Sequence, residues 1–130
     1  MKYSHGTQTI ESYLGKRIVK SGAVGATNVE EVKWLTTQLL TIASGWKTTG
    51  WGYIVDISQM KPVTPDVSEE LVNLHKGLAT NGCKAMAFVN FAAFVTGAQA
   101  KEHQKKSNAA IAEASFKTEE EAIAWIETII

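Results

Sequence analysis

The stretch GWGYIVDISQMKPVTPDVSEEL, residues 50–71, changes from a strand pattern to a helix pattern within one turn. Residues 53–57 are a β-branched and aromatic run after two glycines, which indicates an interior strand. The two prolines that follow exclude further strand, and Thr64 or Asp66 can cap a helix whose apolar positions recur at spacings of three and four. A buried strand that leads directly into such a helix predicts an α/β fold.

The same two patterns extend to both ends of the chain. Strands are expected at residues 7–14 and 16–24 as an antiparallel hairpin, at 85–89 and at 111–116, and helices are expected to begin at Asn28, about Val95 and Thr118. The order of these elements predicts a mixed sheet of about five strands with an N-terminal hairpin and parallel central strands, flanked by about four helices. We expect one domain over residues 1–130.

Composition narrows the class of protein. The chain has 130 residues, 45% hydrophobic content and no net charge, so the overall field that attracts nucleic acid or anionic membranes is absent. The single cysteine, Cys83, excludes an internal disulfide and is compatible with a reducing cytoplasm. The N-terminus lacks the apolar segment of a signal peptide, and the longest apolar run falls far short of the ~18 residues of a membrane span. We therefore expect a cytoplasmic protein without nucleic-acid partners.

Two segments and the order of elements together resemble a known family. YIVDIS at residues 53–58 and FKTEEEAIAWI at residues 116–126 are similar to the STAS-type domains, specifically to the SpoIIAA-like branch, which is related to the lipid-binding CRAL-TRIO fold. The resemblance covers nearly the whole chain. It implies the fold predicted above and a binding or regulatory role, in which a phosphorylated serine after the central strand switches binding of an anti-sigma kinase.

The turn after this strand departs from the family pattern. Asp56 matches the aspartate at the end of the strand, but Pro65-Asp66-Val67-Ser68 replaces the Asp-Ser-Ser-Gly core that carries the phosphorylated serine. The nearest hydroxyl groups belong to Ser58, Thr64 and Ser68, of which Thr64 and Ser68 are the candidate phospho-acceptors. We expect Asp56, Ser58, Thr64, Asp66 and Ser68 to contact a ligand or a partner, because a helix N-terminus favours charged groups. The alternative for Asp56 is capping or loop bonding.

Two further segments have an open interpretation. FAAFVTGAQA, residues 91–100, places Phe91 and Phe94 after the strand at 85–89, where they could line an apolar pocket or a dimer interface, or could pack a helix start. KEHQKK, residues 101–106, is typical of a solvated helix face, with a local basic patch as the alternative.

The histidine and tryptophan residues are the remaining candidates for metal binding and for interfaces. His5, His75 and His103 lack metal-site spacing, and His75 is expected to be exposed or half-buried, so no metal or cofactor is predicted. Trp46 and Trp51 flank a short loop and could serve an interface or close the core.

These observations favour a non-enzymatic binding or regulatory domain. Its partner would be a protein or a small apolar or anionic ligand, with a lipid-like ligand and a homodimer among the options. One alternative is a small enzyme that uses Asp56 with His75 or His103 as acid–base groups. Another is a phospho-acceptor switch at Thr64 or Ser68.

Overall fold

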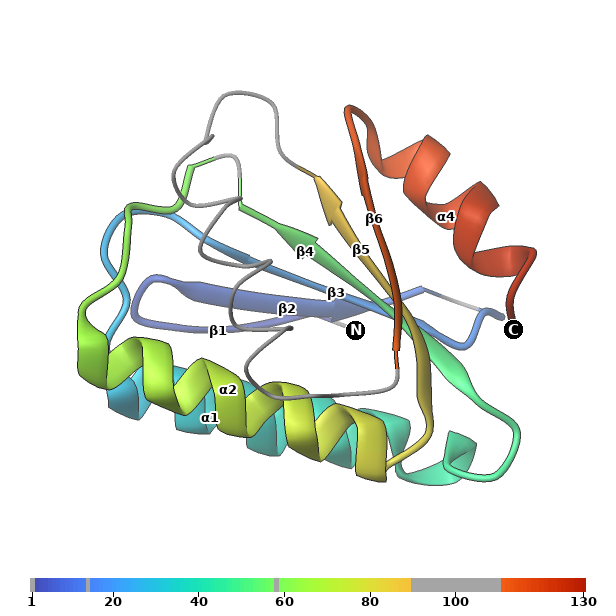
Figure 1. Ribbon diagram of the computed structural model, residues 1–130, viewed down its shortest axis with the longest axis horizontal. Coiled ribbons are helices and arrows are strands. Elements are labelled where there is room, and N and C mark those ends of the chain that lie inside the picture. Colours follow the sequence, from blue (N-terminus) through green and yellow to red (C-terminus); the bar gives the residue numbers. More distant parts are fainter. Residues whose placement is uncertain (1, 14, 58, 90–110) are drawn as a thin grey trace.

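The strands form one six-stranded sheet (Figure 1) in the computed structural model, which describes residues 2–13, 15–57, 59–89 and 111–130. They lie in chain order as β1 (Lys2–His5), β2 (Gln8–Ser12), β3 (Ile18–Ala23), β4 (Trp51–Asp56), β5 (Cys83–Val89) and β6 (Ala112–Phe116). The pairs β1–β2 and β2–β3 are antiparallel, and the three following pairs are parallel. The predicted mixed sheet, with its hairpin and parallel centre, is confirmed.

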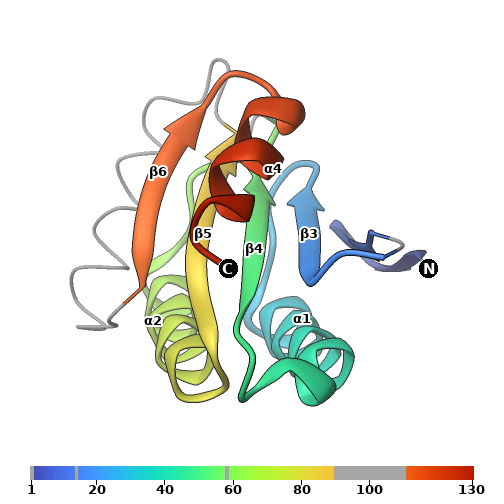
Figure 2. The same ribbon diagram turned by 90° about the vertical axis from the view of Figure 1, so that its right-hand side faces the viewer.

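The helices cover both faces of this sheet. Helix α1 (Val29–Ile42), continued by the 3₁₀-helix η1 (Ala43–Trp46), lies beside α2 (Pro65–Thr80) on one face, and α4 (Glu119–Glu127) lies on the other (Figure 1, Figure 2). The helix expected from about Val95 lies outside the described residues. In the part of the chain that the structure describes, no helix is both long enough and apolar enough to span a membrane.

Strand β1 is the element that the sequence pattern did not predict, which is why the sheet has six strands instead of about five. All four of its residues are exposed, so an edge strand of this kind has no alternation of apolar and polar side chains to reveal it. It is joined to β2 by a two-residue turn that begins with Gly6, whose φ of 60° suits glycine.

Strand β5 is covered on both faces, as its unbroken apolar run predicted. Ala85, Ala87 and Val89 belong to the core under α4. Met86 and Phe88 belong to the core under α1 and α2. Alternate residues of one strand therefore serve two separate cores.

Helix α4 approaches the sheet very closely at Gly52 of β4. A Cβ atom at this position would lie 2.2 Å from Cγ2 of Ile126, so only glycine leaves room for the helix. Ala122 and Ile126 are fully buried, but Ile129 is 37% exposed because the helix ends at Glu127. Ile123 and Trp125 are half-buried against the same core.

Candidate functional site

The predicted site lies where the carboxyl ends of β3 and β4 meet the segment that leads into α2. This segment is held in place by backbone hydrogen bonds to Gly25, which follows β3. The Gly25 N–H donates to Gln59 O at 3.0 Å, and the Lys61 N–H donates to Gly25 O at 2.9 Å. Ligands of open α/β sheets bind outside the carboxyl ends of the parallel strands, so the location suits a binding site. Ser58, Phe91 and Phe94 lie outside the described residues.

Asp56 is the last residue of β4 and is half-buried. Gly22 is its neighbour on β3, and a Cβ atom added at Gly22 would lie 3.6 Å from the Cβ atom of Asp56. Ile18 and Ile54, which stand two or four residues away on the same strands, pack in the core under α4. The side chain of Asp56 therefore projects from the α4 face of the sheet.

Thr64, Asp66 and Ser68 lie at the start of α2. Thr64 precedes the helix, as expected, but its hydroxyl donates to the Asp66 carboxylate and does not cap a backbone N–H. This hydroxyl and the Val67 N–H hold the pKa of the exposed Asp66 carboxyl below its usual range. Ser68 is half-buried, and its N–H donates to Thr64 O at 2.9 Å. The arrangement leaves Thr64 and Asp66 accessible, and phosphorylation of Thr64 or Ser68 stays a prediction.

Beneath this segment, a cavity of about 50 Å³ lies between the sheet and helices α1 and α2. Its described lining is mainly apolar and includes Leu35, Met60, Val63, Leu71, Leu74, Met86 and Phe88. Ser21, Tyr53 and His75 add polar atoms to this wall. The sequence had suggested an apolar pocket only at Phe91 and Phe94, whereas the described lining of this cavity comes from β2, β3, β4, β5, α1, α2 and the segment between β4 and α2.

His75 is the residue whose placement was predicted wrongly. It is 3% exposed and borders the cavity, although the sequence interpretation put it on or near the surface. The spacing of Leu71, His75 and Leu78 is four and three, so the pattern itself placed His75 on the apolar stripe of α2. Its polar character had hidden this signal.

Ser21, Tyr53 and Gln8 are further polar residues of the cavity, and each is engaged by a neighbour. Ser21 and Tyr53 share a hydrogen bond between their hydroxyl groups, and burial raises the pKa of Tyr53 well above its usual value. Gln8 is 4% exposed and donates from Nε2 to Thr27 Oγ1 at 3.0 Å. These groups are neutral, so the cavity suits an uncharged part of a ligand.

The structure places Asp56 and His75, one of the two acid–base pairs considered from the sequence, on different faces of the sheet. Asp56 borders the cavity at the end of β4, but its side chain leaves the sheet on the α4 face, whereas His75 comes from α2 on the opposite face. His5 lies on β1, with Nε2 3.8 Å from Glu30 Oε1, and His103 lies outside the described residues. Among the described residues, no cluster of histidine, cysteine and acidic side chains could hold a metal ion.

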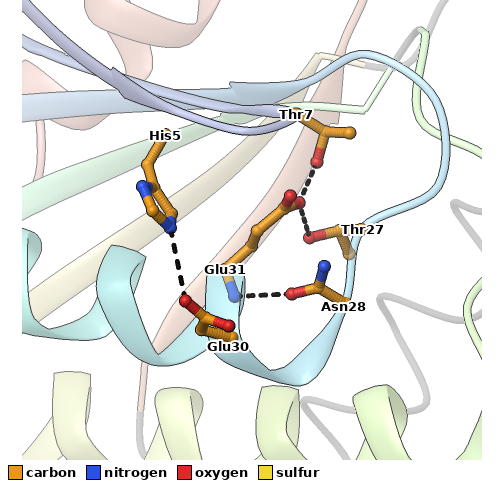
Figure 3. A network of polar contacts seen from close by, with 6 residues as sticks. All are labelled: His5, Thr7, Thr27, Asn28, Glu30 and Glu31. Carbon is orange, nitrogen blue, oxygen red and sulfur yellow. Dashed lines mark hydrogen bonds and ion pairs between the residues drawn. The ribbon is translucent and has the colours of Figure 1, made fainter.

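A second polar cluster joins the β1–β2 turn to the start of α1 (Figure 3). The Glu31 carboxylate accepts hydrogen bonds from the hydroxyl groups of Thr7 and Thr27, the second at 3.0 Å. The Glu31 N–H donates to Asn28 Oδ1 at 2.8 Å, which is the cap that the sequence predicted. The side chain of Glu31 thus contacts Thr7 and Thr27, and only its backbone N–H contacts Asn28.

The surroundings of Glu31 have opposite effects on its ionisation. Burial raises its pKa, while the hydroxyl groups of Thr7 and Thr27, the Thr7 N–H and the nearby His5 lower it, and the net pKa lies below the usual value. The carboxylate thus stays ionised and ties three segments together. We assign this cluster a structural role.

The tryptophans divide between core and surface. Trp51 is completely buried, and its Nε1–H donates to Asn81 O at 2.9 Å, so it closes the core and does not serve an interface. Trp34 stacks on His5 with ring centroids 5.3 Å apart. Trp46 is half-buried.

Comparison with known proteins identifies the fold. No protein-family model matches the sequence, and no curated protein matches it. A solved structure that is similar is that of an uncharacterized protein of the DUF3478 family with a SpoIIAA-like fold from Shewanella loihica PV-4. The two chains are 17% identical, the alignment covers 90% of each, and the TM-score is 0.69. The chain therefore has the SpoIIAA-like fold that its element order and its two motif segments predicted.

Proposed function

We propose that this protein is a non-enzymatic binding domain that takes a small apolar ligand, or the apolar end of a larger one, between the sheet and helices α1 and α2. The observation that carries the proposal is the cavity of about 50 Å³ at the carboxyl ends of β3 and β4. Apolar cavities with a few convergent polar groups are the usual form of small-molecule sites.

The size of the cavity limits what can enter. A water molecule needs ~10–15 Å³ by this measure, so the cavity has room for roughly three to five water-sized groups. Met60 and Met86 border it, and methionine side chains adapt easily to the shape of a ligand. A ligand of a few heavy atoms would fit directly, and a longer chain would need its remainder outside.

The separation of Asp56 and His75 by the sheet supports a binding role over an acid–base reaction. Within the cavity, His75 and Tyr53 supply the groups that would orient a polar end of the ligand. Asp56, Ile57, Met60 and Val63 of the segment before α2 border the same space, so a bound ligand could alter the surface that this segment presents to a partner.

Xenon and isobutanol are suitable probes, because each is small and the second adds one hydroxyl group. We expect both to produce saturable shifts of the amide resonances of Leu74, His75 and Met86 in NMR titrations of the full chain. Leu71→Phe should abolish these shifts by filling the cavity. Val72→Phe is the matched control, since Val72 is also half-buried on α2 but does not line the cavity.

Two results would contradict the proposal. One is the absence of saturable shifts in the wild-type protein at high probe concentration. The other is equal binding by the wild type and by a folded Leu71→Phe variant, which would place the probes elsewhere.

A further inference from the structure

A larger hollow lies on the hairpin side of the molecule, away from the cavity under α2. It is a groove of about 830 Å³ between β1 and the β2–β3 turn on one side and the second half of α1 on the other. Tyr3 pairs with Ile10, a core residue under α1, so Tyr3 projects from the same face of the sheet. The edge of the sheet therefore overhangs α1 and forms the groove.

The groove has an apolar, aromatic wall. Tyr3, Ile42 and Trp46 line it, with Gln38 and Thr41 between them on α1. Tyr3 is 42% exposed and Trp46 is half-buried, so both rings retain surface that a ligand could cover. Tyrosine and tryptophan bury a large area with little loss of side-chain entropy, and the volume lies in the range of about 300–1,000 Å³ typical of ligand sites.

The charges of the groove have a single sign. Lys16 and Arg17 are its charged residues in the described part of the lining, and both are cationic. Arg17 Nε donates to Gly50 O at 2.9 Å, which fixes the position of the guanidinium group. Its terminal nitrogens make no hydrogen bond with the described residues, and these are the donors that bind a carboxylate in a fork.

Lys16 can also turn to a ligand at low cost. Its Nζ lies 3.1 Å from Glu127 Oε1, but the two side chains are 40% and 50% exposed. Exposed ion pairs contribute little to stability, about 0–1 kcal/mol. An anion that pairs with Lys16 would therefore displace only an exposed, weak ion pair.

We propose that this groove binds a small organic anion with a flat apolar body, such as an aromatic carboxylate. The carboxylate would pair with the Arg17 guanidinium, and the ring would lie against Tyr3 and Trp46. A neutral ring would lack the ion pair, and a cationic ring would be repelled by Lys16 and Arg17. The site is separate from the cavity under α2, so the two proposals can fail independently.

A charge series on one ring system tests the proposal directly. 1-Naphthoate, 1-naphthalenemethanol and 1-naphthylmethylamine share the ring and carry an anion, no charge and a cation. We expect 1-naphthoate to shift the Arg17 Nε–H and the Trp46 indole N–H in NMR spectra of the full chain, and to bind at least tenfold more tightly than the alcohol. The amine should produce no saturable shift at these two groups.

Variants then separate the ion pair from the ring contact. Arg17→Met should lower the affinity for 1-naphthoate at least tenfold and leave the affinity for the alcohol unchanged. Lys47→Met is the matched control, because Lys47 adjoins Trp46 in sequence but does not line the groove. Gln38→Glu keeps nearly the same side-chain shape and leaves the hydrogen bond from Arg17 to Gly50 in place. The negative charge that it introduces should lower the affinity for 1-naphthoate and not the affinity for the alcohol.

The outcome that overturns the proposal is equal binding of the three probes, or unchanged 1-naphthoate affinity in both Arg17→Met and Gln38→Glu. Shifts that appear around His75 and vanish in Leu71→Phe would also overturn it, because they would assign the probe to the cavity. Leu71 lines the cavity and not the groove, so the Leu71→Phe variant should bind 1-naphthoate with the affinity of the wild type.

Discussion

Two places in this molecule pair a carboxylate with threonine hydroxyl groups at the start of a helix, and their surroundings differ. At α1, Glu31 is buried and accepts hydrogen bonds from Thr7 and Thr27, which lie in two other segments. At α2, Asp66 is exposed and accepts from Thr64, only two residues away. The same chemistry thus joins distant segments in one place and only shapes a local turn in the other.

The difference shows that burial and sequence separation decide how much such a contact contributes to the stability of the fold. A largely buried carboxylate that loses its donors finds less water to replace them than an exposed carboxylate does. The cluster at Glu31 should therefore govern stability, and the start of α2 should tolerate change.

The largest effect should come from filling the space that the Glu31 carboxylate occupies. A Cβ at Gly6 would lie 1.9 Å from Glu31 Oε2, and the φ of 60° there is unfavourable for alanine. Gly6→Ala should lower the free energy of unfolding by about 2–4 kcal/mol, from backbone strain and lost hydrogen bonds together. Urea denaturation measures this change.

Gly15→Ala is the control for that substitution. Gly15 has a φ of 73°, but a Cβ there would meet nothing within 4 Å. The backbone strain alone should cost about 1–2 kcal/mol. Equal losses in the two variants would show that the carboxylate moves aside freely, and the anchoring role of Glu31 would be refuted.

Removing the charge of Glu31 should have the next largest effect. Glu31→Gln keeps the length of the side chain but weakens the bonds from Thr7 and Thr27, and we expect a loss of about 1–2 kcal/mol in urea denaturation. Glu30→Gln removes a charge one residue earlier, where the carboxylate is 85% exposed and 3.8 Å from His5. Its effect should be within about 0.5 kcal/mol, and a larger loss than for Glu31→Gln would reverse our assignment.

The pH dependence of stability should report the same anchor. The pKa of Glu31 is lower in the folded protein than its usual value of 4.5, so the ionised carboxylate stabilises the fold at pH values above that value. This contribution is lost as the pH falls through the folded pKa. The stability difference between wild type and Glu31→Gln should be constant from pH 7 to pH 6 and should shrink below pH 4.5. A difference that persists unchanged at pH 2 would exclude ionisation of Glu31 as its source.

Much of the fold was predictable because its signals are local. Residues 50–71 change from a β-branched run to a helix that begins with proline, and this change is visible in the sequence alone. The caps at Asn28 and Thr118 likewise mark helix starts without knowledge of the tertiary structure. Strand β1 escaped prediction because all four of its residues are exposed, so its side chains show no alternation of buried and exposed positions.

The candidate site was less predictable, because a cavity is a property of packing. Asp56, Thr64 and Asp66 were proposed from their position after a strand, and their role in binding stays a prediction; the structure places Asp56 at the end of β4 and Thr64 and Asp66 at the start of α2. His75 was misjudged, since its placement depends on where α2 meets the sheet. The groove at Tyr3 and Arg17 requires β1, the one strand that the sequence did not predict, so no sequence signal could have indicated it.

The smallest effect should be that of Thr64→Ala. Thr64 occupies the N-cap position of α2, but its side chain makes no hydrogen bond to the helix backbone. Asn28 at the same position of α1 accepts from the Glu31 N–H at 2.8 Å. Asn28→Ala should therefore cost about 1 kcal/mol in urea denaturation, as loss of a helix cap usually does.

Thr64→Ala should change the free energy of unfolding by only about a few tenths of a kcal/mol, because the bond it removes is exposed and local. It should also raise the pKa of Asp66, since the Thr64 hydroxyl is the main cause of the lowered value, and NMR titration of the Asp66 carboxyl carbon measures this shift. A loss of stability equal to that of Asn28→Ala would mean that Thr64 acts as a cap in solution. In that case the two helix starts would be equivalent, and the contrast between the anchor at Glu31 and the local turn at Asp66 would be refuted.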